Sequence, residues 1–552
     1  MIISFERTPE EYYRLSRAAL AKGELKQALL YGEKALSGKG CTEYKVSLAE
    51  IFLSMDRLSD AIDLALDAYC HGKGFRSEIY EVLIHALNES GRVYESVYFI
   101  TRKAKLEKDE EALDAMDEMM DDFVSEMSES GEASDLFVVG RKKKSEIAFT
   151  LAQATVMMHR GEYGAAIDLL NGLEQKGDHE SDVRSLLLRL YVKAERDQEA
   201  LAVAEEIAER EKRCAYALYV LINKGDRREY LPRLKEVENE RQEMFFAVAA
   251  ADAAGEYDLS VELSERFVQE EPYLPEAYFV LAAVLLNGGD RERSVDALKR
   301  LFALYSKFPA TVILKGWSRM KKCDFSFENG MPESVFSLLR KHVRQGAKNA
   351  EHFRRSLLTD GSFRAASVLM LEAGDREVED NFVRFLGVLN DRQVDRFFSK
   401  LLLNSRIDPI LKRAILAELL FHKDKGALWV SPTGVPVRVP CEKPPCFHLY
   451  PFGLKLAYVN VYSFLVCLSD LPFAGRAALY AEMLLDCEGI EKAKAKDLAA
   501  AMLFRMMTDG ELPAMVSGLP ADEACKMLMQ DVFSAGKINL SAVRKWAAKL
   551  TL

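Results

Sequence analysis

A turn residue recurs at a nearly constant interval along the first half of this chain. Successive turns are 33, 35, 70, 34, 30, 30 and 34 residues apart, and 70 is two periods. Each turn lies between two stretches with helically spaced apolar residues, and a small residue usually follows five positions later. The turn residues are Gly23, Asp56, Gly91, Gly161, Glu195, Gly225, Gly255 and Gly289, and the small residues are Ala28, Ala61, Ser96, Ala166, Ala200, Ser260 and Ser294. A helix–turn–helix repeated about every 34 residues predicts a solenoid of paired helices.

The small residues have a steric role in this interpretation. They fall on the second helix of each pair, where larger side chains would push the two helices apart. One unit departs from the pattern. Around Gly225 the small position is taken by Tyr230, and Pro232 is expected to truncate the second helix.

Several units also share aromatic and proline positions. The turn reads Gly-Glu-Tyr at 161–163 and at 255–257, and the latter unit ends at Pro272. This order resembles the tetratricopeptide family, whose loose pattern is an aromatic residue, a Leu, a small residue, another aromatic, then Ala and a closing Pro. The resemblance covers about residues 9–309, although no unit has the family's Trp and several lack the Pro. It implies an all-α, right-handed α-solenoid of about eight helix pairs that holds other molecules and carries no chemistry.

Beyond Pro309 the period is lost, but short amphipathic helical patterns continue to the end of the chain. A stretch after Gly426 alternates apolar residues around a Pro-Thr-Gly turn and predicts a β-hairpin. The expected division is tetratricopeptide-like repeats over 1–105, an acidic amphipathic helix or linker replacing a degenerate repeat over 106–140, further repeats over 141–309, irregular HEAT-like helices over 310–425, the β-hairpin and a Pro-rich loop over 426–452, and a C-terminal helical domain over 453–552.

The acidic segment allows two interpretations. Residues 107–135 contain 13 carboxylates and one Lys, together with helically spaced Met and Leu residues. A Met-rich acidic helix could dock a basic, apolar partner. A decayed repeat with a solvated outer face is the simpler interpretation, because runs of charge usually serve solvation.

The composition excludes several classes of protein. Of 552 residues, 49% are hydrophobic and 29% charged, and the net charge is −11. Nucleic-acid binding needs a basic footprint, so we expect no nucleic-acid partner. The longest apolar run, Leu454–Leu468, is interrupted by Lys455, Asn460 and Ser463. It is shorter than the roughly 18 to 20 residues that span a bilayer, so we expect no membrane insertion.

The start of the chain and its cysteines bear on location. The opening MIISFERTPEEYY has neither the basic nor the apolar region of a secretory signal. The nine cysteines are odd in number and have no framework spacing, which fits reduced thiols. We therefore expect a cytoplasmic protein. Its oligomeric state stays open, because the ends of a solenoid can pair.

No catalytic motif is present in the sequence. It has no Walker loop, dinucleotide-binding glycine pattern, HExxH helix or G-x-S-x-G elbow. The eight histidines are dispersed, and none has a sequence neighbour that suggests a triad. We therefore predict a non-enzymatic protein without a cofactor.

One group of residues has the ligand types of a zinc site. Cys441, Cys446 and His448 lie close together, and His422 precedes Cys441 by nineteen residues. Four N or S ligands could hold zinc, and a metal here would be structural. Four residues between the cysteines is at the loose edge of zinc spacings, and two prolines stiffen the loop. Buried reduced thiols beside a Pro-rich turn are therefore the favoured interpretation.

The binding face is expected on the first helix of each pair, which lines the concave side of such a solenoid. The candidate residues are Glu43, Glu50, Glu78, Glu81, His85 and Asn88 in the early units, and Tyr219, Phe245, Phe279 and Leu286 in the later units. The early half is acidic and the later half apolar, which suits a segment that is basic at one end and hydrophobic at the other. The alternative is that Phe245 and Phe279 pack between helices.

Two functional hypotheses follow. The first is a scaffold or adaptor that binds a protein or peptide along the concave face. The second places the specific function in the C-terminal domain, as a zinc-stabilised effector or an unrecognised enzyme, with the repeats as a regulatory module. The first is favoured, because the repeats occupy more than half of the chain.

Overall fold

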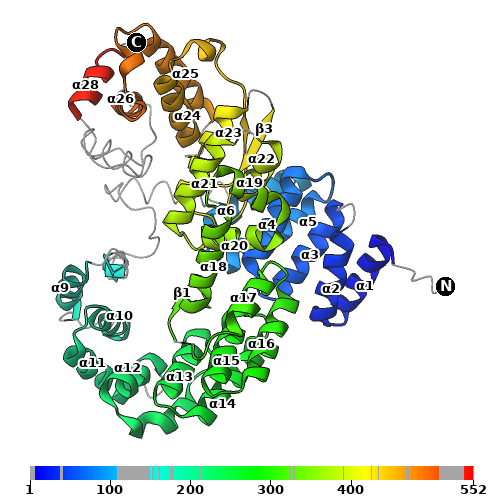
Figure 1. Cartoon of the computed structure of the whole chain (residues 1–552), viewed down its shortest axis with the longest axis vertical. Coiled ribbons are helices and arrows are strands. Elements are labelled where there is room, and N and C mark those ends of the chain that lie inside the picture. Colours follow the sequence, from blue (N-terminus) through cyan, green and yellow to red (C-terminus); the bar gives the residue numbers. More distant parts are fainter. Residues whose placement is uncertain are drawn as a thin grey trace. The chain divides into compact units, whose positions relative to one another are not determined.

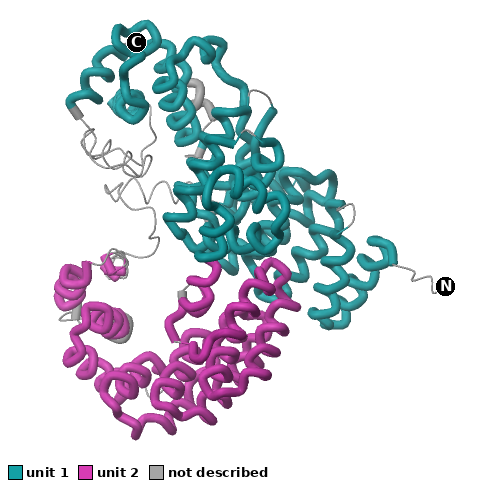
Figure 2. Tube along the Cα trace, in the orientation of Figure 1, with its two compact units in different colours: residues 1–134, 340–552 teal, residues 135–339 magenta. Residues whose placement is uncertain are grey.

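The structure of the chain is a computed structural model, and it is almost entirely helical (Figure 1). It groups into two compact units, which are residues 1–134 with 340–552 (unit 1) and residues 135–339 (unit 2) (Figure 2). The described residues are 7–37, 41–108, 150–151, 154–155, 157–158, 162–174, 180–210, 214–323, 325–328, 330–389, 391–423, 426–432, 434–467, 471–508 and 540–550. The predicted acidic segment over 106–140 lies outside them from residue 109 onward.

Unit 1 begins with three helix pairs. Each helix packs against the next, and the first helices of successive pairs also contact one another. The pairs are α1 (Pro9–Ala21) with α2 (Leu25–Leu36), α3 (Thr42–Ser54) with α4 (Leu58–His71), and α5 (Arg76–Glu89) with α6 (Val93–Glu107). This is the helical-repeat solenoid that the 34-residue period predicts.

Unit 2 continues the same arrangement (Figure 1). Its elements are α9 (Tyr163–Glu174), α10 (Glu180–Lys193), α11 (Asp197–Arg210), α12 (Ala215–Gly225), η1 (Arg228–Glu236), α13 (Arg241–Ala253), α14 (Tyr257–Glu270), α15 (Pro275–Asn287), α16 (Arg291–Leu304), α17 (Ala310–Trp317) and the short strands β1 (Phe327–Glu328) and β2 (Met331–Pro332). The first helices of its pairs are α10, α12, α13 and α15, because each of them precedes a repeat turn.

The repeat turns share one backbone geometry. At Gly255 φ is +75°, and the Glu256 N–H donates to the Ala251 carbonyl at 3.0 Å. This hydrogen bond closes the helix end and needs a residue in the left-handed region, which glycine adopts at least cost. The left-handed residues at these turns are Gly23, Asp56, Gly91, Glu195, Asp226, Gly255 and Gly289. The turn residue that recurs in the sequence therefore terminates the first helix of each pair, in addition to changing the direction of the chain.

The degenerate unit differs from the prediction by one residue. Its left-handed residue is Asp226, with φ of +49°, and not Gly225. The element that follows is η1, a 3₁₀ helix that contains Pro232. The predicted truncation of the second helix is thus confirmed, since proline lacks an N–H for the α-helical ladder. The predicted turn at Gly161 lies outside the described residues.

The small residues after the turns are completely buried. All seven predicted positions have 0% exposure, namely Ala28, Ala61, Ser96, Ala166, Ala200, Ser260 and Ser294. Ser294 also donates a hydrogen bond from Oγ to the Ala282 carbonyl of the paired helix at 2.7 Å. The close approach of the helices that these residues were expected to permit is confirmed.

Helices continue through the middle and C-terminal parts of the chain. The elements are α18 (Glu333–Gly346), α19 (Ala350–Thr359), α20 (Gly361–Glu372), α21 (Arg376–Val388), α22 (Arg392–Leu401), α23 (Pro409–His422), β3 (Ala427–Val430), β4 (Val437–Pro440), η2 (Pro445–Leu449), α24 (Phe452–Cys467), α25 (Leu471–Leu485), η3 (Ile490–Lys492), α26 (Ala495–Thr508) and α28 (Leu540–Ala547). The predicted hairpin is β3 paired antiparallel with β4. A second, unpredicted hairpin is formed by β1 and β2.

Unit 1 joins segments that are far apart in sequence. The backbone N–H of Ser405 donates to the Asp63 carboxylate at 2.6 Å, and Arg406 contacts Asp60 at 3.2 Å. The rings of Tyr69 and Trp429 meet at 6.1 Å. The outer side of α4, a second helix, is therefore covered by residues that follow α22 and by the β3–β4 hairpin.

None of the described helices combines the length and the apolar character that crossing a bilayer requires. The apolar run after Leu454 forms α24, and Leu454, Ala457 and Val461 on it are fully buried.

Candidate binding face on the first helices

Four aromatic side chains form a continuous surface on two first helices of unit 2. Tyr216 and Tyr219 lie on α12, and Phe245 and Phe246 lie on α13. Tyr216 meets Phe246 at 4.6 Å between ring centroids, and Phe245 meets Phe246 at 5.4 Å. All four are partly exposed, and each packs against the core of unit 2 on its inner side. We call these four residues the aromatic face.

Helix periodicity places these rings together. Tyr216 and Tyr219 are three residues apart, so they lie on the same side of α12. The opposite side of that helix carries Ala217, Leu218 and Leu221, which are completely buried. The small and aliphatic residues fill the space between the helices. The two tyrosine rings therefore lie on the side of α12 that is partly exposed.

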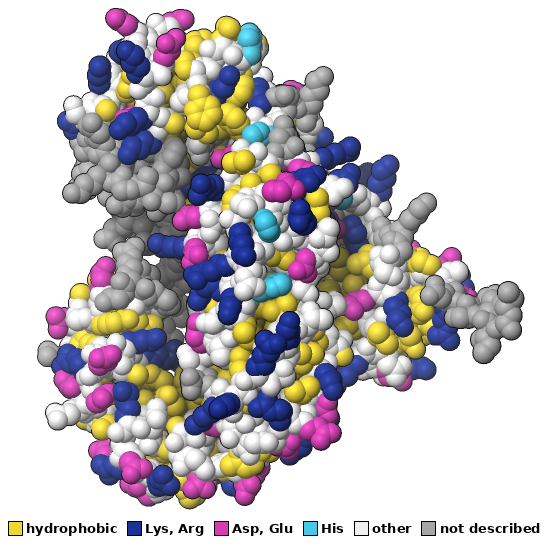
Figure 3. All heavy atoms as spheres, viewed as in Figure 1, with side chains coloured by type: hydrophobic (Ala, Val, Ile, Leu, Met, Phe, Trp, Pro, Cys, Tyr) yellow, Lys and Arg dark blue, Asp and Glu magenta, His cyan; other side chains and the backbone are white. Residues whose placement is uncertain are grey.

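Polar groups border the aromatic face at α10. The Arg189 guanidinium lies 5.7 Å from the centre of the Tyr216 ring and also donates to Gln242 at 3.1 Å. Asn223 donates to the Tyr219 hydroxyl at 3.0 Å. Burial raises the pKa of Tyr216 to about 12, so its hydroxyl stays protonated at neutral pH. Figure 3 shows basic and hydrophobic side chains next to each other over this part of unit 2.

A segment after α17 turns back across the neighbouring first helices. We call residues Cys323–Pro332, of which 324 and 329 are not described, the return segment. Its Phe327 ring meets Phe245 at 5.1 Å, and its Phe325 ring meets Phe245 at 6.4 Å. Its strand β2 packs against α15. The first-helix side of α13 and α15 is therefore covered by the chain itself.

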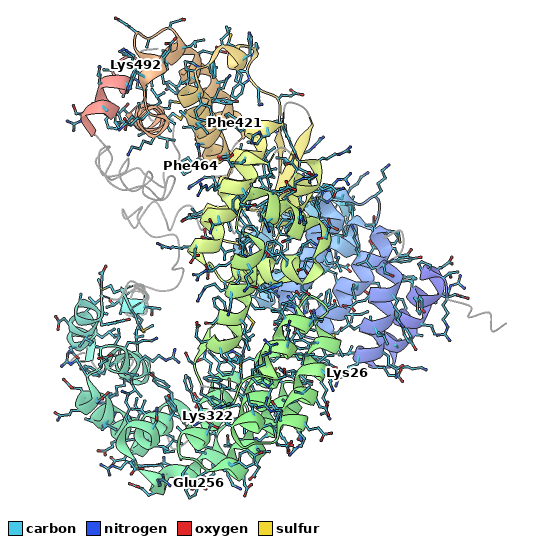
Figure 4. All side chains as sticks on the ribbon, viewed as in Figure 1. Lys26, Glu256, Lys322, Phe421, Phe464 and Lys492 are labelled. Carbon is cyan, nitrogen blue, oxygen red and sulfur yellow. The ribbon has the colours of Figure 1, made fainter. Side chains whose placement is uncertain are left out.

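The backbone of the return segment is held by a side chain of α15. Asn287 donates to the Cys323 carbonyl at 2.9 Å and accepts from the Cys323 N–H at 2.8 Å. It also donates to the Asp252 carboxylate of α13 at 3.3 Å. Burial raises the pKa of Asp252, while nearby Lys322 opposes this rise. Lys322 is labelled in Figure 4, beside α13.

Two of the four predicted apolar residues lie on this face, and two do not. Tyr219 and Phe245 are partly exposed members of it. Phe279 has 0% exposure and Leu286 has 3%. Phe279 packs against Phe308 at 5.8 Å. A side chain without exposed surface cannot contact a partner, so the alternative of packing between helices holds for Phe279.

Phe279 and Leu286 are buried because α15 is covered on all sides. Each residue from 277 to 286 is buried. The helix packs against α14 and α16 on one side and against α13 and β2 on the others. The sequence places Phe279 on a first helix but does not show that α15 is covered along its length.

The predicted acidic residues of unit 1 are exposed or partly exposed, but half of them are paired. Glu50 on α3 forms an ion pair with Arg17 on α1. Glu81 on α5 pairs with Lys103 on α6 at 2.9 Å. These basic partners reduce the predicted attraction for a basic segment, because the carboxylates already have counter-charges.

The remaining early candidates differ in their surroundings. Glu43 is hydrogen-bonded to Tyr13, and burial together with this bond raises the pKa of Tyr13 to about 12. Glu78 and His85 are exposed on α5. Asn88, also exposed, accepts a hydrogen bond from the Ser96 hydroxyl at 2.5 Å. These candidates are accessible and polar, and Tyr13 also stacks on Tyr44 at 4.9 Å between ring centroids.

The four candidate zinc ligands do not come together. Within the described part of the chain no three His, Cys, Asp or Glu side chains form a group that could hold a metal ion. Cys441 is buried at the end of β4, whereas His448 is exposed on η2. Burial raises the pKa of the Cys441 thiol. For Cys441, Cys446, His448 and His422, reduced thiols beside a Pro-rich turn stay the favoured interpretation and remain a prediction.

Sequence reasoning missed half of the aromatic face and the whole of the return segment. Tyr216 and Phe246 were available as the Tyr-x-x-Tyr spacing on α12 and the Phe-Phe pair on α13. Phe325 and Phe327 stand in a Phe-Ser-Phe run outside the repeat pattern. That pattern of alternate aromatic residues indicates an extended segment with one apolar side, but not where it lies.

Comparisons with known proteins reach only the fold. No family model matches the chain, and no curated protein matches it. Among solved structures, the APC/C hetero-tetramer Cut9–Hcn1 is 14% identical, with a TM-score of 0.26, over 90% of this chain and 96% of that one. The TPR domain of P58(IPK) is 15% identical, with a TM-score of 0.20, over 70% and 96%. Yeast Tom70 is 12% identical, with a TM-score of 0.22, over 98% and 95%.

Similarity at this level says nothing about partners. The likeness to tetratricopeptide repeats lies in the repeat itself, in which helix pairs, left-handed turns and buried small residues recur with a period near 34. The chain is a helical-repeat protein whose repeats are tetratricopeptide-like. Its array presents side chains on the first helices of the pairs.

Proposed function

We propose that this protein is a non-enzymatic scaffold or adaptor that binds a protein or peptide segment on the aromatic face of unit 2. The observation that most directly supports this proposal is that four partly exposed aromatic rings on α12 and α13 are in continuous contact. Aromatic side chains at a surface supply a large contact area at small cost in conformational entropy. Clustered exposed rings of this kind are typical of interaction sites.

The surroundings favour a protein over other partners. The chain is acidic, with a net charge of −11, which opposes binding to nucleic acid. Arg189 at the edge of the aromatic face supplies a charge for orientation, while the rings supply most of the contact. The seven described cysteines are free thiols, which supports the proposed cytoplasmic location.

The test is partner capture by the full chain with a double substitution, Tyr216→Ala with Tyr219→Ala. A photo-crosslinking amino acid placed at Gln242, which is exposed beside these rings, identifies the captured protein by mass spectrometry. Loss of two contact aromatics is expected to weaken capture at least about tenfold, because such residues commonly contribute 1 kcal/mol or more each.

The matched control is Tyr230→Ala, which removes a partly buried tyrosine from η1 on the second-helix side. It should leave capture unchanged. Far-UV circular dichroism checks that both variants remain folded. Equal capture by the wild type and by the folded Tyr216/Tyr219 variant would show that the aromatic face is not the binding site. The experiment uses the full chain, since unit 1 is built from both ends of the sequence.

A further inference from the structure

The return segment has the contacts of a bound peptide. Phe325 and Phe327 both meet Phe245, while Ser326 between them is exposed. Alternate residues of an extended chain point to the same side, so the two rings face α13 together. The hairpin β1–β2 continues this extended conformation and packs against α15.

The backbone of the segment is also recognised. The Asn287 amide bonds both the N–H and the carbonyl of Cys323. A side-chain amide that pairs with both groups of one residue reads an extended backbone without regard to its side chains. Recognition therefore has two parts, which are a backbone contact at Asn287 and a pocket for alternate aromatic side chains at Phe245.

The middle of the segment is held less firmly than its ends. Cys323 and Met331 are 1% and 4% exposed. Phe325 and Phe327, by contrast, remain partly exposed, as does the Phe245 ring that they cover. Anchored ends and a partly exposed middle allow the two rings to leave α13 while the rest of the array stays folded.

We infer that the return segment occupies the place of a partner on unit 2, and that the partner taken there is an extended segment with two aromatic residues in an aromatic-x-aromatic pattern. This inference rests on the proposed function and specifies its partner. The occupied place adjoins the open rings of Tyr216, Tyr219 and Phe246. An incoming segment would contact those rings and replace Phe325 and Phe327 on Phe245.

The test uses a fluorescent peptide with the sequence of residues 319–332, in which Cys323→Ser prevents oxidation. In the wild-type chain the tethered segment competes at an effective concentration that reaches millimolar values. The full-length variant Phe325→Ala with Phe327→Ala, which we call the vacated variant, lacks the two rings that cover Phe245. It should therefore bind the peptide at least about tenfold more tightly than the wild type.

Two controls define the site. Adding Phe245→Ala to the vacated variant should abolish peptide binding, and a peptide with both phenylalanines replaced by alanine should not bind. Equal affinity of wild type and vacated variant, or binding that survives Phe245→Ala, would overturn the inference. So would a finding, by light scattering, that two copies of the chain exchange their return segments.

A second measurement needs no variant. Saturating peptide added to the wild-type chain should increase hydrogen exchange at residues 325–328, because the segment loses the ring contacts with Phe245 that hold it on α13. Unchanged exchange in the presence of bound peptide would overturn displacement. Capture through Tyr216 and Tyr219 can still succeed in that case, so failure here is distinguishable from failure of the proposed function.

Discussion

The two units cover opposite sides of the same kind of array with later parts of their own chain. In unit 1 the covered side belongs to the second helix α4, where Asp63 and Tyr69 meet residues after α22 and on β3. In unit 2 the covered side belongs to the first helices α13 and α15. The predicted acidic residues on the first helices of unit 1 stay exposed or partly exposed, whereas the first helices of unit 2 carry the aromatic face, which is partly occupied. A repeat therefore defines where surfaces lie, and the covering segment defines which of them is available.

The largest expected effect is a pH-dependent loss of folding stability caused by Asp63, on the covered side of unit 1. Burial raises the pKa of Asp63 from 3.8 to about 6, against the opposing hydrogen bond from Ser405. Because the pKa of Asp63 is higher in the folded chain than in the unfolded chain, its protonated form contributes fully to the free energy of unfolding below about pH 4. This contribution is lost as the pH rises through 6. The loss at pH 7 is about 3 kcal/mol at most.

Asp63→Asn removes this ionisation and keeps an oxygen for the Ser405 N–H. Urea unfolding followed by intrinsic fluorescence at pH 4, 5, 6 and 7 should show that the wild type loses stability relative to this variant over that range. The other titrating groups cancel in the difference. A difference that is constant with pH would mean that Asp63 is not desolvated, and that the cover over α4 is loose.

The next largest effect is a loss of stability when Asn287, on the covered side of unit 2, is replaced. Asn287→Ala removes the hydrogen bonds of this amide to the Cys323 N–H, the Cys323 carbonyl and the Asp252 carboxylate. Loss of these partly buried hydrogen bonds should cost about 1–3 kcal/mol and increase hydrogen exchange from residue 320 to 328. The comparison in unit 1 is Asn88→Ala, in the last turn of the first helix α5.

Asn88 is exposed, and its side chain accepts a hydrogen bond from the Ser96 hydroxyl, so loss of this side chain should cost less than about 1 kcal/mol. Exchange measured by mass spectrometry on both variants separates the two cases. Equal small effects would show that the return segment lies on unit 2 without depending on Asn287.

The smallest effect concerns the open face of unit 1. Arg17 and Glu50 bridge α1 and α3 with side chains that are 46% and 35% exposed. A double-mutant cycle of Arg17→Ala and Glu50→Ala should give a coupling below about 1 kcal/mol, decreasing further in high salt. A large, salt-independent coupling would indicate that this face is less open than its exposure suggests.

The sequence determined the local architecture of this protein. The period, the turn residues and the buried small residues follow from contacts within a helix pair and between neighbouring pairs, which a short repeating pattern records. The hairpin at 427–440 and the truncation at Pro232 are local in the same sense. Of the predicted apolar binding residues, Tyr219 and Phe245 are partly exposed on first helices, as their helical spacing indicates, and their role in binding stays a prediction.

Only the tertiary structure decided which of these surfaces is covered. Phe245 and Phe279 are 34 residues apart and hold the same place in successive repeats, yet one is partly exposed and the other has 0% exposure. No repeat pattern separates them, since their burial depends on the elements that pack around α15. The meeting of Asp63 with Ser405 is likewise a contact between segments 342 residues apart. Such contacts depend on complementary surfaces of distant segments, and local periodicity carries no record of them.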